Sequence, residues 1–464
     1  MIDRQEILEF SREFSLRPDV VEKDYALGWL LAGIDQHATT KESWVFKGGT
    51  CLKKCYFETY RFSEDLDFTL LDPMHLNQDF LLKTFKEISE WVYEQSGLEL
   101  SATSMKFEIY QNPRGKSSAQ GRIGYRGPLA PGGDLPRIKL DITNDEKVVL
   151  KPVKRKVHHG YSDVPPAGIE ILSYPFEEVF AEKVRALSER ELPRDLYDVI
   201  HLYRHPEMRP SREVVVNVLK EKCLFKGIPF PKLQTLEQEP QRTEIKTEWS
   251  NMLAHQLPSL PPFESFWSEL VQVFAWLENK IEPPTLRPIQ YKGKETEDQT
   301  WLPSSVAQPW GVRIPLEVIR FAGANRLIVN LGYQGKERLI EPYSLRRTQA
   351  GNILLHAIRV DSGEHRSYRI DEIESAEVTS RTFVPKYIVE LTPAGPVQAP
   401  LQERARRSFS SYFGSDTKYI IRCSKCGKEF ERSSQYDTSL NAHKNKSGYQ
   451  CYGGIGQFVR QKRS

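Results

Sequence analysis

A proline-rich stretch at residues 282–310, EPPTLRPIQYKGKETEDQTWLPSSVAQPW, divides the sequence into two regions with different hydrophobic patterns. Before it, apolar residues recur at helical spacing in 175–203 and in 263–281. After it, alternating segments succeed one another at intervals of roughly ten residues, as in a small β-barrel or sandwich. A chain of 464 residues also exceeds the size at which one hydrophobic core usually keeps growing. We therefore expect two to four domains.

The first region mixes helices with short strands. After helical patterning at the N-terminus, we predict strands at 44–46 and 66–70 on either side of a helix that starts at Thr50. A hairpin at 105–126 and an alternating strand at 137–143 follow. These elements predict a mixed α/β core.

Within this core, the stretch FKGGTCLKKCYFETYRFSEDLDF joins a glycine turn to two aspartates one residue apart. Alternation along a strand places Asp65 and Asp67 on one face. Such a pair suits Mg²⁺, which commonly uses one or two carboxylates plus substrate phosphates. The turn of residues 47–50 leads into a helix whose free N–H groups attract phosphate. The pattern predicts a nucleoside triphosphate with Mg²⁺, although each motif alone also fits a tight turn and a solvated acidic strand edge.

Four motifs in this order closely resemble the nucleotidyltransferase motif of the DNA polymerase β superfamily, and specifically the AbiEii/AbiGii (MenT-like) toxin family. The resemblance covers about residues 20–205. The matching residues are Lys47, Gly48, Gly49 and Thr50; Arg61, Ser63, Asp65 and Asp67; Lys139, Asp141 and Thr143; and Glu182, Lys183, Arg194, Asp195 and Asp198.

The resemblance implies a polymerase-β-type nucleotidyltransferase fold with a mixed sheet. Asp65, Asp67 and Asp141 would be the catalytic carboxylates and would hold two Mg²⁺ ions for in-line displacement on an NTP substrate. The implied nucleotide-binding residues are Lys47, Gly48, Gly49, Thr50, Ser63, Lys139, Lys183 and Asp195. Taken alone, Lys139 and Lys183 also fit solvated surfaces, and Asp198 is expected to be mainly structural.

Residues 311–388 resemble a WYL domain, with the segments Y-x-G-x-x-R, E-P-Y-x-L and R-x-Y-R-I-D-x-I in order. The predicted strands begin with LEVIRFA at 316–322. The resemblance implies a small SH3/Sm-like β fold that senses a nucleic-acid or nucleotide ligand. The binding candidates are Tyr343, Arg346, Arg347, Arg366 and Arg369. The guanidinium groups of the arginines match phosphate geometry. The alternative is that these arginines only keep a β-barrel soluble.

The C-terminal tail contains Cys423 and Cys426 in a C-x-x-C knuckle, followed by His443 and Cys451. Three thiolates and one imidazole suit tetrahedral structural Zn²⁺, and a tail this short needs such a staple to fold. Residues 418–464 hold ten Lys or Arg against three Asp or Glu, about +7 by count. This excess favours nucleic acid, although a basic solvated tail gives the same count.

Together these observations predict the following organisation: a nucleotidyltransferase domain at 1–205, a helical extension at 206–281, a linker at 282–310, a WYL-like β domain at 311–390, a second linker at 391–417 and a basic zinc-binding tail at 418–464. The N-terminus lacks the pattern of a secretory signal, and six cysteines in so long a chain argue against a disulfide framework. We expect a cytoplasmic protein.

Two functions remain open at this point. The first is an Mg²⁺-dependent nucleotidyltransferase toxin of a toxin–antitoxin or phage-defence system. It would transfer a nucleoside monophosphate to a tRNA 3′ end or to a protein hydroxyl, and would have a cognate antitoxin as its partner. The second is a non-catalytic sensor that binds nucleotide and nucleic acid under the control of the WYL-like domain. The intact carboxylates favour the enzyme.

Overall fold

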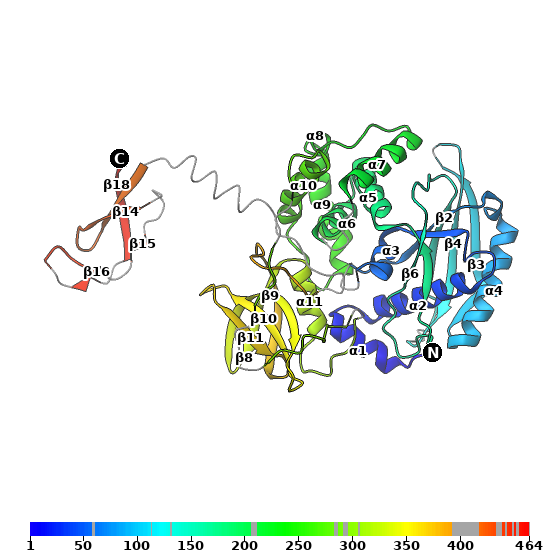
Figure 1. Cartoon of the computed structure of the whole chain (residues 1–464), viewed down its shortest axis with the longest axis horizontal. Coiled ribbons are helices and arrows are strands. Elements are labelled where there is room, and N and C mark those ends of the chain that lie inside the picture. Colours follow the sequence, from blue (N-terminus) through cyan, green and yellow to red (C-terminus); the bar gives the residue numbers. More distant parts are fainter. Residues whose placement is uncertain are drawn as a thin grey trace. The chain divides into compact units, whose positions relative to one another are not determined.

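The computed structural model describes residues 1–57, 61–112, 114–129, 132–205, 211–282, 286–290, 296–304, 307–391, 417–432, 439–440, 443–447, 450–451 and 454–463. The chain forms two compact units, residues 1–400 and 401–464 (Figure 1). The predicted linker at 391–417 lies almost wholly outside the described residues.

A seven-stranded mixed sheet is the centre of the first unit. Its strands are β1 (Trp44–Lys47), β2 (Asp65–Leu70), β3 (Glu99–Gln111), β4 (Ser117–Arg126), β5 (Arg137–Thr143), β6 (Val153–Lys156) and β7 (Glu170–Ser173), in the order β3-β4-β5-β2-β1-β7-β6. The pairs β2–β5 and β1–β7 are parallel and the others antiparallel. The predicted mixed α/β core and its strands are confirmed.

Three helices pack against this sheet: α2 (Pro18–Gln36), α3 (Gly48–Cys55) and α4 (Gln78–Ser96). The N-terminal helix α1 (Arg4–Phe14) packs on α2, and a 3-10 turn lies at Pro73–His75. α4 packs on β3 and on α2, and the sheet residues on that side are buried. Burial alternates along β2: Leu66 and Phe68 are fully buried, whereas Asp65 and Asp67 face the other side of the sheet. The alternation expected at the two aspartates is confirmed.

A group of helices follows the sheet: α5 (Phe176–Arg190), α6 (Pro193–Arg204), α7 (Arg212–Lys226), α8 (Leu233–Leu236), α9 (Gln241–Leu253), a 3-10 turn at Ala254–Gln256 and α10 (Phe263–Leu277) (Figure 1). The predicted helical stretch at 175–203 is interrupted once. Glu191 has a φ of +53° and caps α5, and Pro193 begins α6. α6 packs against α5, α9 and α10, so it is central to this group.

The C-terminal part of the first unit, here called the second β region, contains α11 (Leu316–Ala324) and a five-stranded antiparallel sheet. Its strands are β8 (Leu327–Tyr333), β9 (Lys336–Arg347), β10 (Ile353–Arg359), β11 (His365–Arg369) and β12 (Ile373–Thr382), in the order β11-β10-β9-β8-β12, with a 3-10 turn at Ile370–Glu372. The later predicted strands are confirmed. The strand predicted at LEVIRFA is wrong, because these residues form α11. Every residue of α11 is buried, including the paired Glu317 and Arg320, so the helix has no exposed polar face that would give the sequence a clear helical period.

The second unit has a small sheet in the order β14-β13-β18-β15, built from β13 (Thr417–Cys423), β14 (Glu429–Arg432), β15 (Ser439–Leu440) and β18 (Gly454–Arg463). The short strands β16 (His443–Lys444) and β17 (Gln450–Cys451) pair with each other. Across the described parts of both units, no helix is both long enough and apolar enough to cross a lipid bilayer.

Candidate active site and metal centre

A cavity of about 340 Å³ lies where β1, β2 and β5 face α5. One part of its lining is acidic: Asp65, Asp67, Asp141, Glu146, Glu182 and Glu189. Another part is basic: Lys47, Arg61, Lys183, Arg185, Arg190, Arg194 and Lys226. Gly48, Gly49 and Ser63 also line the cavity. Carboxylates beside a cluster of cations can hold a metal ion together with a phosphorylated substrate.

The sheet register brings the three predicted carboxylates together. Asp67 on β2 stands directly opposite Asp141 on β5. Asp65 lies two residues before Asp67, on the same face of β2. Burial raises the pKa of Asp67 to about 6, and the charges of Asp141 and Asp65 add to the rise while Lys47 opposes it. The pKa of Asp141 is also raised, by burial and by Asp65. Carboxylates this crowded require a cation, and three hard oxygen donors fit Mg²⁺.

The glycine turn packs directly on these aspartates. Gly48 has a φ of +81°, and a Cβ there would lie 2.1 Å from Asp67 Oδ2. A Cβ on Gly49 would lie 2.4 Å from Arg61 Nη2. The side chain of Thr50 is buried, and its Oγ1 donates a hydrogen bond to the backbone carbonyl of Asp65 at 2.5 Å. This bond connects the glycine turn to β2. Only glycine fits at position 48, because both the backbone conformation and the space exclude a side chain. The helix begins at Gly48, two residues before the predicted start.

A buried ion-pair cluster holds the basic side of the cavity. Arg61 donates to both oxygens of Asp198, at 2.8 and 2.9 Å. Lys183 Nζ lies 2.6 Å from Asp198 and 3.2 Å from Asp195. Burial alone would raise the pKa of Asp198, but Arg61 and Lys183 outweigh it and hold that pKa well below its usual range. Asp195 is fully buried and also binds Arg190, so it positions two cavity cations without lining the cavity itself.

Residues 29–272 match the family described as "Nucleotidyl transferase AbiEii toxin, Type IV TA system". The chain belongs to this AbiEii family. The family therefore supplies its activity as a nucleotidyltransferase and its context as the toxin of a toxin–antitoxin system. The non-catalytic alternative is set aside, since the family is one of enzymes.

Solved structures give weaker similarities. The nucleotidyltransferase toxin MenT4 of Mycobacterium tuberculosis H37Rv has 17% identity and a TM-score of 0.41 over 60% of this chain and 90% of its own. JHP933 from Helicobacter pylori has 16% identity and a TM-score of 0.37 over 57% and 96%. The proteasome accessory factor PafBC of Arthrobacter aurescens has 14% identity and a TM-score of 0.14 over 61% and 41%. No curated protein sequence matches the chain.

Several residues of this AbiEii cavity were missed by sequence reasoning. Glu146, in the loop after β5, lies 3.5 Å from Lys47 and 3.0 Å from Lys226 of α7. Arg185 pairs with Glu182 and also faces Glu146. Helical spacing from Glu182 signals Arg185, because the two lie on one face of α5. Nothing in the sequence signals Lys226, which arrives from the helical region beyond the motifs.

Two cations of the predicted motifs have distinct settings. Arg194 lines the cavity at the start of α6 and has no ion-pair partner among the residues that the structure describes, so its charge is available to a phosphate. Lys139 stands opposite Asp65 in the register, but its side chain is exposed on the sheet face and does not line the cavity. Lys139 thus lies beside the three candidate carboxylates and outside the group of cations that line the cavity.

The residues predicted to bind ligand in the second β region all have hydrogen-bond or ion-pair partners within the protein. Each is held by a local partner: Tyr343 donates to Glu341, Arg346 pairs with Glu390, Arg347 with Asp298, Arg366 with Glu364 and Arg369 with Asp371. Arg366 also lines a separate cavity of about 210 Å³ with Arg338, Arg359 and Tyr368. The Tyr368 hydroxyl is buried and has no hydrogen-bond partner within the described part of the chain.

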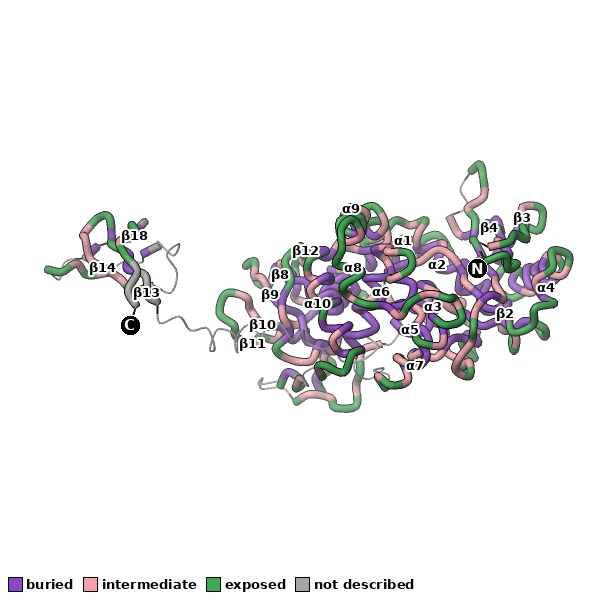
Figure 2. Tube along the Cα trace, turned by 90° about the horizontal axis from the view of Figure 1, so that it is seen from above, coloured by how far each residue is buried: buried purple, intermediate pink, exposed green. Residues whose placement is uncertain are grey.

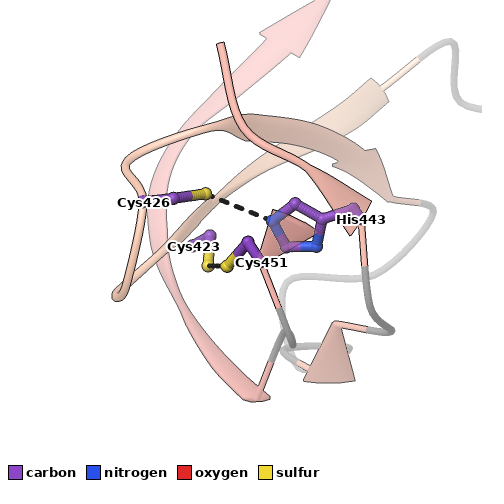
Figure 3. A group of neighbouring side chains, drawn as sticks. All are labelled: Cys423, Cys426, His443 and Cys451. Carbon is purple, nitrogen blue, oxygen red and sulfur yellow. Dashed lines mark hydrogen bonds between the residues drawn. The ribbon is translucent and has the colours of Figure 1, made fainter. Parts of the chain in front are cut away.

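The second unit brings its four predicted ligands together (Figure 3). The ligand atoms of Cys423, Cys426, His443 and Cys451 lie within 4.8 Å of one another. Cys423 Sγ is 3.9 Å from Cys451 Sγ, and Cys426 Sγ is 3.2 Å from His443 Nε2. Tetrahedral Zn–S bonds of about 2.3 Å separate two sulfurs by roughly 3.8 Å, so the set fits Zn²⁺. Its packed neighbours, Leu440 and Phe430, form a very small core.

The intact protein is expected to contain one Zn²⁺, and Cys423→Ser should abolish zinc binding and unfold the described strands of the second unit. The reason is that so small a core does not fold without the free energy of metal binding. Metal analysis and protease sensitivity of the tail measure both effects. The buried Cys223→Ser on α7, outside the cluster, serves as the control. Zinc retained by Cys423→Ser would contradict the assignment.

Proposed function

We propose that this AbiEii enzyme transfers a nucleoside monophosphate from an NTP to the 3′ hydroxyl of an RNA, with tRNA as the proposed acceptor. The observation that carries the proposal is the single cavity in which Asp65, Asp67 and Asp141 face a group of cations. The carboxylates suit divalent cations, and the cations suit a triphosphate. The acceptor is proposed, and a protein hydroxyl is the competing choice.

Each part of the cavity has its own task in this proposal. Asp65, Asp67 and Asp141 hold the divalent cations, which lower the cost of hydroxyl deprotonation and of charge on the triphosphate. Lys183 and Arg194 contact phosphate oxygens, and Asp198 and Asp195 fix Lys183 at its position. The Gly48–Gly49 backbone lets phosphate approach the start of α3 closely.

The acceptor hydroxyl must approach in line with the bond that breaks. Asp141 lies at the side of the cavity that continues into the exposed face of β3, β4 and β5. The covered sides are formed by α5 and by the start of α6. An acceptor therefore enters past Asp141, while the nucleotide occupies the part next to α5.

Incubation of the protein with Mg²⁺, each labelled NTP and tRNA tests this function. Label is expected in the RNA with at least one nucleotide, and chelation of Mg²⁺ should remove it. Periodate oxidation of the RNA 3′ end should also prevent labelling, because it destroys the accepting hydroxyl. Label that appears only in protein would contradict the RNA acceptor while leaving nucleotide transfer in place.

Two further roles belong to the same proposal. The family context implies a cognate antitoxin that restrains transfer. The second β region is proposed to bind an anionic ligand, for which the arginine-lined cavity at Tyr368 offers an unpaired buried hydroxyl and three guanidinium groups. Zn²⁺ in the tail would be structural.

A further inference from the structure

An exposed sheet face extends from the catalytic carboxylates toward the edge strand β3. On β3, β4 and β5 one set of alternate residues is mostly buried, with α4 packed on β3, and most residues of the other set are partly or fully exposed. Figure 2 shows exposed residues along β3 and β4. This face is continuous with the candidate active site, because Asp141 belongs to the same set of residues on β5.

A row of cations crosses this face in register. Lys106 on β3 stands opposite Arg122 on β4, Arg122 stands opposite Lys139 on β5, and Lys139 stands opposite Asp65 on β2. Three strand spacings of about 4.8 Å separate Lys106 on β3 from Asp65 on β2, a distance of roughly 14 Å. The row therefore ends at one of the metal-binding carboxylates.

The described residues hold none of these three cations in an ion pair. Lys106, Arg122 and Lys139 are exposed, and none has an ion-pair partner among the described residues. Arg122 donates at 2.9 Å to Gln120, which is uncharged. Arg137, on the same face of β5, is also exposed and likewise has no ion-pair partner among the described residues. Like charges at neighbouring strand positions repel one another, so such a row is costly without an anionic partner.

The neighbouring positions fit a nucleic acid. Tyr110 on β3 is 46% exposed, and its ring is available for stacking. Partial burial and the charge of Asp141 raise the pKa of Tyr110, which shows that its hydroxyl lies within electrostatic reach of that carboxylate. Two acidic residues of β3 also belong to this face, but neither stands in the cationic row: Glu108 stands opposite Gln120, and Glu99 pairs with Arg126. Lysine is depleted from protein–protein interfaces, whereas phosphate backbones favour it.

We infer that this face of β3, β4 and β5 is the docking surface for the RNA acceptor. Lys106, Arg122 and Lys139 bind consecutive parts of the phosphate backbone, Tyr110 stacks on a base, and the 3′ end reaches the cavity beside Asp141. The inference rests on the proposed RNA acceptor and adds the path along which the RNA lies.

The double variant Lys106→Glu/Arg122→Glu tests this surface, with Lys151→Glu/Lys156→Glu as a control. The control makes the same charge change on two exposed lysines at the opposite edge of the same sheet, at and just before β6. Binding of tRNA is measured over a salt series. The test variant should bind tRNA more weakly. The slope of log K against log salt concentration should become shallower by about 1.4, because two phosphate contacts contribute about 0.7 each. The control should match the unmodified protein.

Two readouts separate the possible failures. Mg²⁺-dependent NTP binding should be the same in all three proteins, because Lys106 and Arg122 do not line the cavity. If the unmodified protein labels tRNA and the test variant equals the control in affinity and slope, the surface assignment is overturned. If the unmodified protein neither binds nor labels RNA, the proposed acceptor is wrong and the docking surface with it.

Discussion

Asp65→Ala and Asp67→Ala variants are each expected to lose nucleotide transfer by roughly a thousand-fold or more. Either change leaves the metal-binding group with two carboxylates instead of three, and the several kcal/mol that a bound metal contributes to the transition state correspond to that factor. The measurement is transfer of labelled nucleotide under single-turnover conditions. Full activity of either variant would remove the catalytic assignment.

The conservative variant Asp67→Asn separates catalysis from folding. Asp67 has a folded pKa of about 6, above its ordinary value of 3.8. The folded state therefore binds more protons than the unfolded state between those values, and metal-free stability falls as the pH rises through that window. At neutral pH the charged Asp67 carboxylate therefore costs about 3 kcal/mol of stability, and an uncharged asparagine avoids this cost.

Without Mg²⁺, Asp67→Asn should thus be at least as stable as the unmodified protein at neutral pH, although it is inactive. Added Mg²⁺ should stabilise the unmodified protein more than the variant, because only the former keeps all three carboxylates. Chemical denaturation with and without Mg²⁺ measures both. A variant that is inactive and also strongly destabilised would show that Asp67 acts through folding.

The geometry of the candidate active site could be predicted from the sequence because its parts are local. Asp65 and Asp67 alternate within one strand, and the glycines adjoin one helix start, so a short motif contains their geometry. Burial of Leu66 and Phe68 follows from the same alternation. Which strand lies beside β2 came from the family motif at Asp141, and the register confirms that these positions are neighbours.

What could not be predicted depends on tertiary contacts or on missing periodicity. Lys226 enters the cavity from α7, and no motif or spacing connects it with Asp67. α11 lacked a signal for another reason: its residues are buried on all sides, so β-branched Val318 and Ile319 favoured a strand. The partners of Arg346 and Arg347 also lie far away in sequence, at Glu390 and Asp298.

Asp198→Asn is expected to reduce both stability and nucleotide binding. Its carboxylate is fully buried and accepts from Arg61 and Lys183, so its removal leaves two buried cations without their shared partner. Breaking a buried pair in this way costs about 3–5 kcal/mol. The sequence assigned Asp198 a mainly structural role, and the contacts connect that role with the cavity through Lys183.

The position of α6 explains why the loss should reach beyond one ion pair. On another side of this helix, Tyr197 donates to Asn325 at 2.9 Å and Arg204 donates to the carbonyl of Ala324 at 3.1 Å. α6 is therefore anchored at both the cavity and the second β region. Without the Asp198 carboxylate, Lys183 is held less firmly at the cavity. The KM for NTP is therefore expected to rise.

The pH dependence gives the sharpest test of the Asp198 contacts. The folded pKa of Asp198 is lowered, so its contribution is present above the unfolded pKa of about 3.9 and is lost as the pH falls below it toward the folded value. The stability difference between the unmodified protein and Asp198→Asn should accordingly be constant from neutral pH to about pH 5 and shrink at lower pH. Asp371→Asn, which breaks an exposed pair with Arg369, is the control and should change stability little. A difference for Asp198→Asn that stays constant into the acid range, or that matches the control, would show that the buried carboxylate does not stabilise this site.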